Sequence, residues 1–201
     1  MSECPQLDQH AGRMLLRIAR REIEAAVRGI SHTLEDAGTS GEESPSSLAA
    51  FCRWAAAIPH AGVFVTLRTF GRLRGCIGTF SDEADLVSTI IEMARASLSD
   101  PRFHAMRITE SELADLGIEV SILSPRTRLT DPLQFELGRD GIYIKSGSRA
   151  GCFLPDVATD AGWNREQFLS ALCREKAHLS PDAWRDPDTE VYAFTVRKFR
   201  E

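Results

Sequence analysis

Cys76 lies in a short segment whose residue types can support thiol chemistry. The segment reads LRGCIGTF from Leu73 to Phe80. Alternate side chains of a strand share a face, so Arg74 and Cys76 are expected to project together. A neighbouring guanidinium stabilises a thiolate, which is the nucleophilic and metal-binding form of cysteine. The pattern therefore favours a thiol that acts as a nucleophile or as a ligand, with Arg74 tuning it or binding an anion.

Two glycines flank this cysteine, and they leave two interpretations open. Gly75 and Gly78 allow a ligand or another strand to approach the backbone closely. In the first interpretation they form part of a binding site together with Thr79. In the second they serve packing around a structural cysteine, because free cysteine is among the most buried residue types.

Other polar residues could complete such a site. His60 and His104 are the histidines available as a general base, although only their availability supports that role. Asp100 and Arg102 flank Pro101 and could line the site, with Arg102 holding a carboxylate or phosphate through two hydrogen bonds. Alternatively, Asp100 caps backbone amides and pairs with Arg102, as is common in turns.

The position of the cysteine depends on a predicted hairpin. Alternating apolar residues predict a strand over 63–68, residues 69–72 can turn the chain, and 73–80 form the second strand. A helix capped by Ser81 or Asp82 is expected to follow.

The remaining elements indicate the fold class. An amphipathic helix with Asp8 as its N-cap comes first, and residues 35–47 are expected to be an exposed loop before a short helix that begins near Leu48. Further strands are predicted at 118–123, 142–145, 152–154 and 191–196, with capping boxes at Thr109/Glu112 and Asn164/Gln167. This order predicts an α+β fold with antiparallel or mixed sheets flanked by helices.

Composition narrows the functional classes. The 201 residues carry 24 Lys and Arg against 29 Asp and Glu, a net charge of −5 that disfavours purely electrostatic binding of nucleic acid. No apolar run approaches the ~20 residues of a membrane span, and the start of the sequence lacks signal-peptide features. Five cysteines without a Cys-x-x-Cys spacing argue against disulfides and a zinc site. We therefore expect a cytoplasmic protein with no membrane association and no tightly bound metal.

Several separated blocks carry a family resemblance. GVFVTL at 62–67 precedes LRGCIGTF, and DPRF at 100–103 follows it. GRDGI at 138–142 and GW at 162–163 come later, in the same order as in the AMMECR domain family. The chain resembles that family over roughly residues 8–201, so we interpret residues 1–201 as a single AMMECR domain.

The resemblance implies an architecture and three functional hypotheses. Members of the family have a larger and a smaller lobe without a clean linker. In the AmmeMemoRadiSam system they are encoded beside, or fused to, Memo-like and radical SAM proteins. The first hypothesis is a thiol-dependent enzyme, or enzyme component, that acts on a small molecule or modified nucleotide at Cys76. The second is a non-catalytic partner that docks on a Memo-like or radical SAM protein, and the third is an RNA-binding or RNA-modification module. The sequence assigns no cofactor and does not decide whether the protein is an enzyme.

Overall fold

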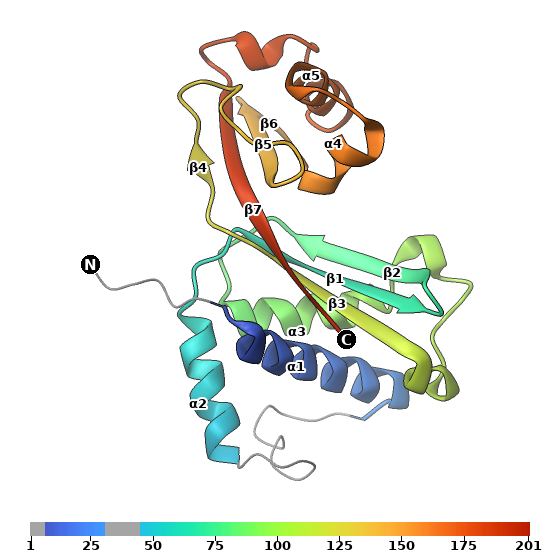
Figure 1. Ribbon diagram of the computed structural model, residues 1–201. Helices are drawn as coiled ribbons and strands as arrows, with labels where there is room; N and C mark the ends of the chain where they lie inside the picture. Colours follow the sequence, from blue (N-terminus) through green and yellow to red (C-terminus); the bar gives the residue numbers. More distant parts are fainter. Residues whose placement is uncertain (1–6, 31–44) are drawn as a thin grey trace. The chain divides into compact units, whose positions relative to one another are not determined.

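The computed structural model describes residues 7–30 and 45–201, with the backbone alone at 45–47 (Figure 1). The chain divides into two compact units. Unit 1 comprises Met1–Ile122 and Lys198–Glu201, and unit 2 comprises Leu123–Arg197. The α+β class expected from the sequence is confirmed: helices accompany strands in both units, and every strand pair with a described register is antiparallel.

The first helix, α1 (Gln9–Arg28), is amphipathic, as its sequence predicts. The Asp8 carboxylate accepts a hydrogen bond from the backbone N–H of Ala11 at 2.7 Å, which confirms Asp8 as the N-cap. The helix ends at Gly29, whose φ of 68° is the left-handed conformation that glycine adopts at helix ends. Its apolar face, including Leu15, Ala19 and Ile23, is buried in the unit 1 core.

The sheet of unit 1 is built on the predicted hairpin. Strands β1 (Gly62–Thr69) and β2 (Arg72–Thr79) pair antiparallel, and β3 (Leu116–Leu123) lies on the other side of β1. Helices α1 and α3 (Leu86–Ser97) pack together, and α3 lies against both strands of the hairpin (Figure 1). The helices therefore cover one face of this sheet.

Two predicted helix starts in unit 1 are wrong. The N-cap of α3 is Asp85, whose carboxylate accepts from the N–H groups of Val87 and Ser88, and not Ser81 or Asp82. Asp85 directly precedes the apolar face of the helix, so the cap is set by the first buried turn. Helix α2 (Pro45–Ala56) begins three residues before Leu48, within the predicted loop 35–47. The other residues of that loop, 35–44, lie outside the described residues.

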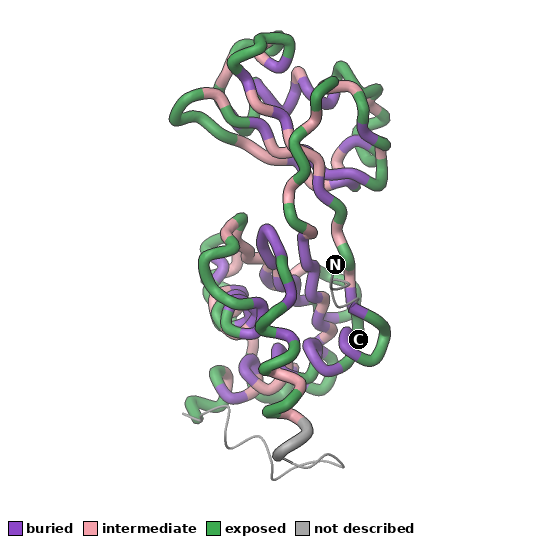
Figure 2. The backbone as a smooth tube through the Cα atoms, turned by 90° about the vertical axis from the view of Figure 1, so that its left-hand side faces the viewer, coloured by how far each residue is buried: buried purple, intermediate pink, exposed green. Residues whose placement is uncertain are grey.

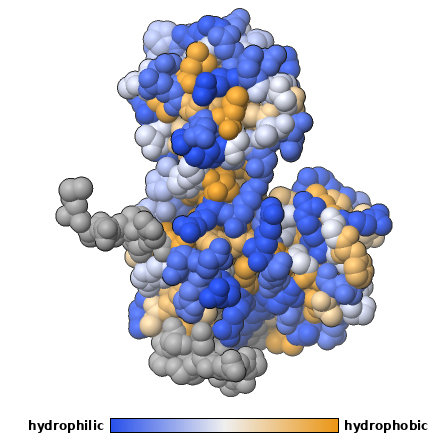
Figure 3. Space-filling model, viewed as in Figure 1, coloured by the Kyte–Doolittle hydropathy of each residue, from blue (hydrophilic) through white to orange (hydrophobic). Residues whose placement is uncertain are grey.

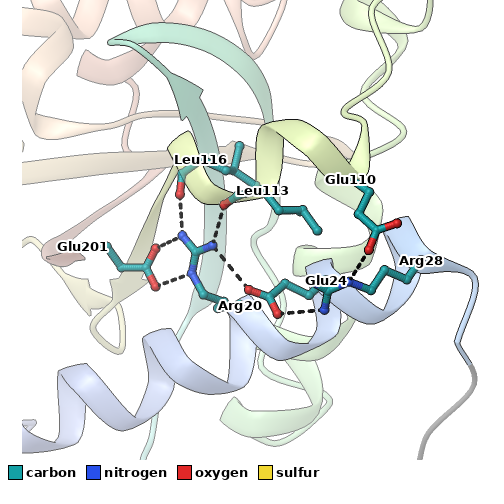
Figure 4. Close-up of polar contacts among 7 residues, drawn as sticks. All are labelled: Arg20, Glu24, Arg28, Glu110, Leu113, Leu116 and Glu201. Atoms are coloured by element: carbon teal, nitrogen blue, oxygen red, sulfur yellow. Dashed lines mark hydrogen bonds and ion pairs between the residues drawn. The ribbon is translucent and has the colours of Figure 1, made fainter.

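Arg20 connects three parts of unit 1 (Figure 4). Its guanidinium, on α1, donates to the backbone carbonyls of Leu113 and Leu116, at the end of η3 (Glu110–Asp115) and the start of β3. It also forms a two-pronged ion pair with the Glu201 carboxylate, with Nε at 2.8 Å from Oε1. These contacts hold the C-terminal residue beside β3, where the Glu201 N–H donates to the Ile118 carbonyl.

Unit 2 has its own core and contains the paired strands β4 to β7. Strand β5 (Asp140–Ser146) pairs with β6 (Arg149–Phe153) on one side and with β7 (Glu190–Arg200) on the other, and β7 also pairs with β4 (Thr127–Arg128). Helix α5 (Arg165–Glu175) packs on β5 and β6, while α4 (Pro155–Ala161) packs on β5. The predicted Asn164/Gln167 capping box opens α5.

Some elements of this part of the chain were not predicted from the sequence, and others have different bounds from those predicted. It predicted neither α4 nor β4, which are only seven and two residues long. The last strand extends from Glu190 to Arg200, beyond the predicted 191–196, and its final residues belong to unit 1. Near Trp184, η4 (Ala183–Arg185) is a short 3₁₀-helix. Near Phe103, η2 (Pro101–Phe103) is a single turn of 3₁₀-helix.

The buried residues are divided between the two units. Figure 2 shows buried stretches along helices and strands, joined by exposed connections. Two separate clusters of buried apolar residues exist, one on α1, α3 and β1 to β3, the other on α5, β5 and the neighbouring loops. No helix within residues 7–30 and 45–201 combines the length and apolarity needed to cross a membrane.

Candidate functional site

Cys76 lies on β2, the edge strand of the unit 1 sheet. It sits opposite Thr66 of β1, and the Thr66 hydroxyl donates a hydrogen bond to the Cys76 sulfur at 3.3 Å. The preceding residue, Gly75, faces α3, so Cys76 points to the face of the sheet opposite that helix. The residue is half-buried. The thiol is therefore held on the helix-free side of the sheet by the hydrogen bond from the Thr66 hydroxyl.

Asp100 and Arg102 clamp the backbone of Cys76. A carboxylate oxygen of Asp100 accepts the Cys76 N–H at 2.9 Å, and the Arg102 guanidinium donates to the Cys76 carbonyl at 3.0 Å. An edge strand leaves such outward backbone groups without a partner strand. The two side chains supply, at this one residue, the hydrogen bonds that a neighbouring strand would make.

The clamp is charged at neutral pH. Asp100 is buried, with 2% of its surface exposed, and its carboxylate accepts the Arg102 N–H, Nε and Nη2 at 3.0, 3.0 and 2.7 Å. These hydrogen bonds from Arg102 hold the pKa of Asp100 well below its usual range. The pKa of Arg102 is raised, first by Asp100 and to a smaller extent by the Cys76 side chain. Arg102 thus places a positive charge beside Cys76.

Arg74, the predicted partner of Cys76, has other contacts. Its guanidinium forms an ion pair with Glu112 and donates to the Thr69 hydroxyl at 3.3 Å and the Met106 carbonyl at 3.1 Å. The hairpin register shifts at this point: Leu67 opposes Gly75 and Arg68 opposes Leu73, so Arg74 is the extra residue of a β-bulge. The bulge interrupts the simple alternation on which the prediction rested.

The motif glycines lie at tight packing contacts. A Cβ on Gly75 would lie 2.1 Å from the backbone oxygen of Ser97, at the end of α3. A Cβ on Gly78 would lie 2.2 Å from the ring of Phe64, the residue opposite it on β1. Thr79 pairs with Val63 where β1 begins. These positions are occupied by protein atoms, which favours a packing role for both glycines.

A groove of about 360 Å³ in unit 1 is lined by residues of β1, β3 and the end of the chain. Its wall includes Thr66 and Arg68 of β1, Glu119 of β3, and Arg200 and Glu201 at the chain end. Arg200 forms an ion pair with Glu119. Thr66 both lines the groove and hydrogen-bonds Cys76, so the groove and the thiol are connected through one side chain.

The two histidines considered as bases lie apart from the described contacts of Cys76. His60 is buried, and its Nε2 lacks a hydrogen-bond partner among the described residues. His104 is exposed, with Nδ1 3.2 Å from the Pro101 carbonyl oxygen. Among residues 7–30 and 45–201, no group of three or more His, Cys, Asp or Glu side chains is arranged to hold a metal ion.

The other described cysteines have a different environment. Burial raises the thiol pKa of Cys52 and Cys173, and raises that of Cys152 to about 12. Such thiols are poor nucleophiles at neutral pH because little thiolate is present. Cys4 lies outside the described residues.

The sequence predicted Asp100 and Arg102 at this site, and both contact the backbone of Cys76, but it did not indicate Thr66 or the contacts of Arg74. Thr66 opposes Cys76 only because of the bulge, since an unbroken register from the 70–71 turn would place it opposite Gly75. Glu112 was identified for its capping box with Thr109, which is present, but not as the partner of Arg74. Glu119 and Arg200 meet through contacts distant in sequence. Alternation in β1 was the one signal that could have indicated Thr66.

These features define a two-unit α+β protein whose candidate site lies on a hairpin of unit 1. The sequence profile of the AMMECR1 family matches residues 16–199, and the chain belongs to that family.

Relatives match nearly the whole chain. Protein MK0488 of Methanopyrus kandleri is 38% identical, with 98% of this chain and 91% of that protein covered. A protein of Thermococcus onnurineus is 40% identical, with 94% and 90% covered. The crystal structure of protein PH0010 from Pyrococcus horikoshii matches with a TM-score of 0.71 at 34% identity, covering 94% of this chain and 91% of that one.

Proposed function

We propose that unit 1 carries a thiol-dependent small-molecule site, with Cys76 as its nucleophile or ligand and the groove beside Thr66 as the place where the molecule binds. The observation that carries the proposal is the hydrogen bond from Thr66, a groove residue, to the half-buried Cys76 sulfur. The groove has a volume of about 360 Å³, which falls in the range of small-molecule sites.

The charges around the thiol suit this role. The Thr66 hydroxyl donates a hydrogen bond to the sulfur, and Arg102 places its guanidinium beside Cys76. Asp100 fixes Arg102 and the Cys76 backbone, so the sulfur is held on a rigid strand. In the groove, Arg68 offers a cation to a polar ligand, while Glu119 is ion-paired with Arg200.

A set of small cysteine-reactive electrophiles tests the proposal. The folded protein would be incubated with each compound, and the modified cysteine identified by mass spectrometry. We expect a subset of compounds to label Cys76 preferentially, and Arg68→Gln, on the groove wall, to change which compounds react. Arg72→Gln is the matched control, because Arg72 is an exposed residue of the same hairpin outside the groove lining.

One outcome would show that the groove does not select ligands for Cys76. In that outcome, labelling follows the intrinsic reactivity of each compound, and Arg68→Gln and Arg72→Gln react with the same compounds. Full activity of a Cys76→Ser protein in its cellular pathway would also exclude the thiol mechanism.

A second candidate function, docking on a Memo-like or radical SAM protein, is favoured by one surface feature. Phe70, at the tip of the β1–β2 hairpin, is 80% exposed, and Met106 nearby is 54% exposed. Arg74 joins the two segments by donating to Thr69 and to the Met106 carbonyl. Figure 3 shows hydrophilic and hydrophobic residues interspersed on the face in view. An exposed Phe at a hairpin tip suits insertion into an apolar pocket of a partner.

Calorimetric titration against a purified Memo-like protein and a purified radical SAM protein tests this second function. Phe70→Asn is expected to weaken binding by tenfold or more, as truncating a central aromatic contact does. Trp54→Gln, another partly exposed aromatic position of unit 1, is the control. Equal affinities for the wild type and Phe70→Asn would exclude the hairpin tip as the docking element.

A further inference from the structure

The β1–β2 hairpin carries a pair of aromatic rings on the same face as Cys76. Val63 and Val65, on either side of Phe64, are buried in the unit 1 core, so Phe64 points to the helix-free face. Phe80, directly after β2, meets Phe64 edge to face, with ring centroids 5.0 Å apart and ring planes at 68°. Phe64 is half-buried and Phe80 is 39% exposed, so part of this aromatic surface is open to a ligand.

Gly78 allows the Phe64 ring to lie close to the thiol. Phe64 opposes Gly78 in the hairpin, and the next pair on the same face is Thr66 opposite Cys76. A Cβ on Gly78 would lie 2.2 Å from the Phe64 ring, so the ring lies directly over the backbone of β2. Residues two positions apart on a strand are about 7 Å apart, which is the separation between Gly78 and Cys76. The absent side chain therefore places an aromatic ring beside the sulfur.

The groove lies on the other side of the thiol from this ring. Thr66 donates to the Cys76 sulfur and also lines the groove, together with Arg68. Arg68 is exposed, donates to the Gly71 carbonyl at 3.1 Å, and has no carboxylate partner among the described residues. The helix-free face of β1 thus presents, in order, an aromatic ring, the hydroxyl that contacts the thiol, and a groove with a polar wall.

We infer that the ligand of this site is a small aromatic molecule, with its ring against Phe64 and Phe80 and its polar part extending past Thr66 into the groove. The inference rests on the function proposed above and names the class of molecule that Cys76 meets. Aromatic rings attract one another in edge-to-face and offset arrangements, beyond the effect of the apolar area that they bury. The Phe64–Phe80 pair therefore favours an aromatic ring over a saturated ring of the same size.

Alkylation of Cys76 by three chloroacetamides tests the inference. The compounds are 2-chloroacetamide, its N-benzyl derivative and its N-cyclohexylmethyl derivative, which share one reactive carbon and differ in the attached group. In each reaction the sulfur displaces chloride from that carbon, and the thiol proton is released to water. Mass spectrometry follows the rates on the folded full-length protein, and each rate is divided by the rate with N-acetylcysteine. The benzyl compound should react about tenfold faster than 2-chloroacetamide and about threefold faster than the cyclohexylmethyl compound.

Variants of the aromatic pair locate the ring of the probe. Phe80→Leu should reduce the preference for the benzyl compound about threefold, because one of the two rings is lost. Phe64→Leu should reduce it at least as much. Phe70→Leu is the matched control, because Phe70 is 80% exposed at the far end of the same hairpin, and it should keep the preference of the wild type. Phe80 is partly exposed, so Phe80→Leu decides the question even where Phe64→Leu fails to fold.

Three outcomes would overturn the inference and leave the proposed thiol site standing. The first is equal labelling of Cys76 by all three compounds after normalisation. The second is equal labelling by the benzyl and cyclohexylmethyl compounds, which shows an apolar surface without preference for an aromatic ring. The third is a benzyl preference that Phe80→Leu and Phe70→Leu retain equally, which places the ring of the probe elsewhere. If no compound labels Cys76 in the folded protein, the proposed function fails, and the inference fails with it.

Discussion

At the scale of single residues, most of the LRGCIGTF segment serves packing, whereas the side chain of Cys76 is only half-buried. Gly75 and Gly78 have protein atoms where a Cβ would be, and Asp100 and Arg102 satisfy the backbone of Cys76. Cys76 itself directs its sulfur to the helix-free face of the sheet and accepts a hydrogen bond from Thr66. The surrounding residues hold the strand in place, and the thiol is the group that we propose to react.

Replacing Asp100 by Asn should destabilise unit 1. The change removes the charge that holds Arg102 and puts an amide where a buried carboxylate accepts four hydrogen bonds. We expect the free energy of unfolding to fall by about 2–4 kcal/mol, measured by urea denaturation. Asp115→Asn, at an exposed position of the same unit, is the control and should change it by less than about 0.5 kcal/mol. Equal effects of the two substitutions would contradict the clamp.

Acidic pH should lower the stability of unit 1. Arg102 lowers the pKa of Asp100, and Arg74 lowers that of Glu112 from 4.5 to about 2. Because both folded-state values lie below those of the unfolded chain, the unfolded chain takes up protons first as the pH falls. The stabilisation is therefore complete above about pH 5 and is lost as the pH falls from about 4.5 towards 2.

Urea midpoints measured at pH 7 and pH 3 test this prediction. The wild type should lose more stability between the two values than Asp100→Asn or Glu112→Gln does. An identical loss in all three proteins would show that other groups control the acid sensitivity.

Gly75 provides a separate test of packing. In Gly75→Ala the new methyl group would meet the Ser97 backbone oxygen, which cannot move without shifting the end of α3. We expect a loss of about 1–3 kcal/mol in the free energy of unfolding. Gly117→Ala is the matched control, because its nearest contact would be 3.7 Å away. Unchanged stability in Gly75→Ala would mean that the sheet and α3 are less tightly packed than described.

At the scale of elements, the hairpin shows what local patterns can and cannot predict. Alternation and turn residues located β1 and β2 correctly, because both depend on neighbouring residues. The bulge at Arg74 changes which residues face each other, and no local pattern indicated it. The candidate site combines residues from β1, β2 and η2, so its residue types were visible in the sequence while their pairings were not.

The turn of this hairpin stores strain that a substitution can release. Phe70 has a φ of 48°, in the left-handed region that bulky residues rarely adopt, and its side chain is 80% exposed. Asn tolerates this conformation and is preferred in two-residue hairpin turns. Phe70→Asn should therefore raise the free energy of unfolding by about 0.5–1 kcal/mol in urea denaturation. A clear loss of stability would show that the Phe70 ring makes stabilising contacts.

At the scale of the whole molecule, two cores imply two regions of stability. The order of helices and strands was enough to predict the α+β class, because capping boxes and alternating strands are local features. The division between residues 122 and 123, with the return of Lys198–Glu201 to unit 1, depends on long-range pairing along β7. The strand predicted from the sequence ended at residue 196, which is too early, because the charged residues Arg197, Lys198 and Arg200 follow the apolar part of the strand.

A core substitution in unit 2 tests the independence of the two cores. Phe168 is fully buried in the unit 2 cluster, so Phe168→Ala should cost about 3–5 kcal/mol. Hydrogen exchange should increase in β5, β6 and α5, while α1 and α3 keep most of their protection. A uniform increase over the whole chain would indicate a single cooperative unit.

The most direct test of the central claim is the rate at which each cysteine of the folded protein is alkylated at neutral pH. Mass spectrometry would follow the wild type and Thr66→Val. The account predicts that Cys76 reacts faster than Cys52, Cys152 and Cys173, and that Thr66→Val slows Cys76 alone, because the hydrogen bond to sulfur is lost. Protection of Cys76 until the protein unfolds, or an unchanged rate in Thr66→Val, would contradict a reactive thiol at this site.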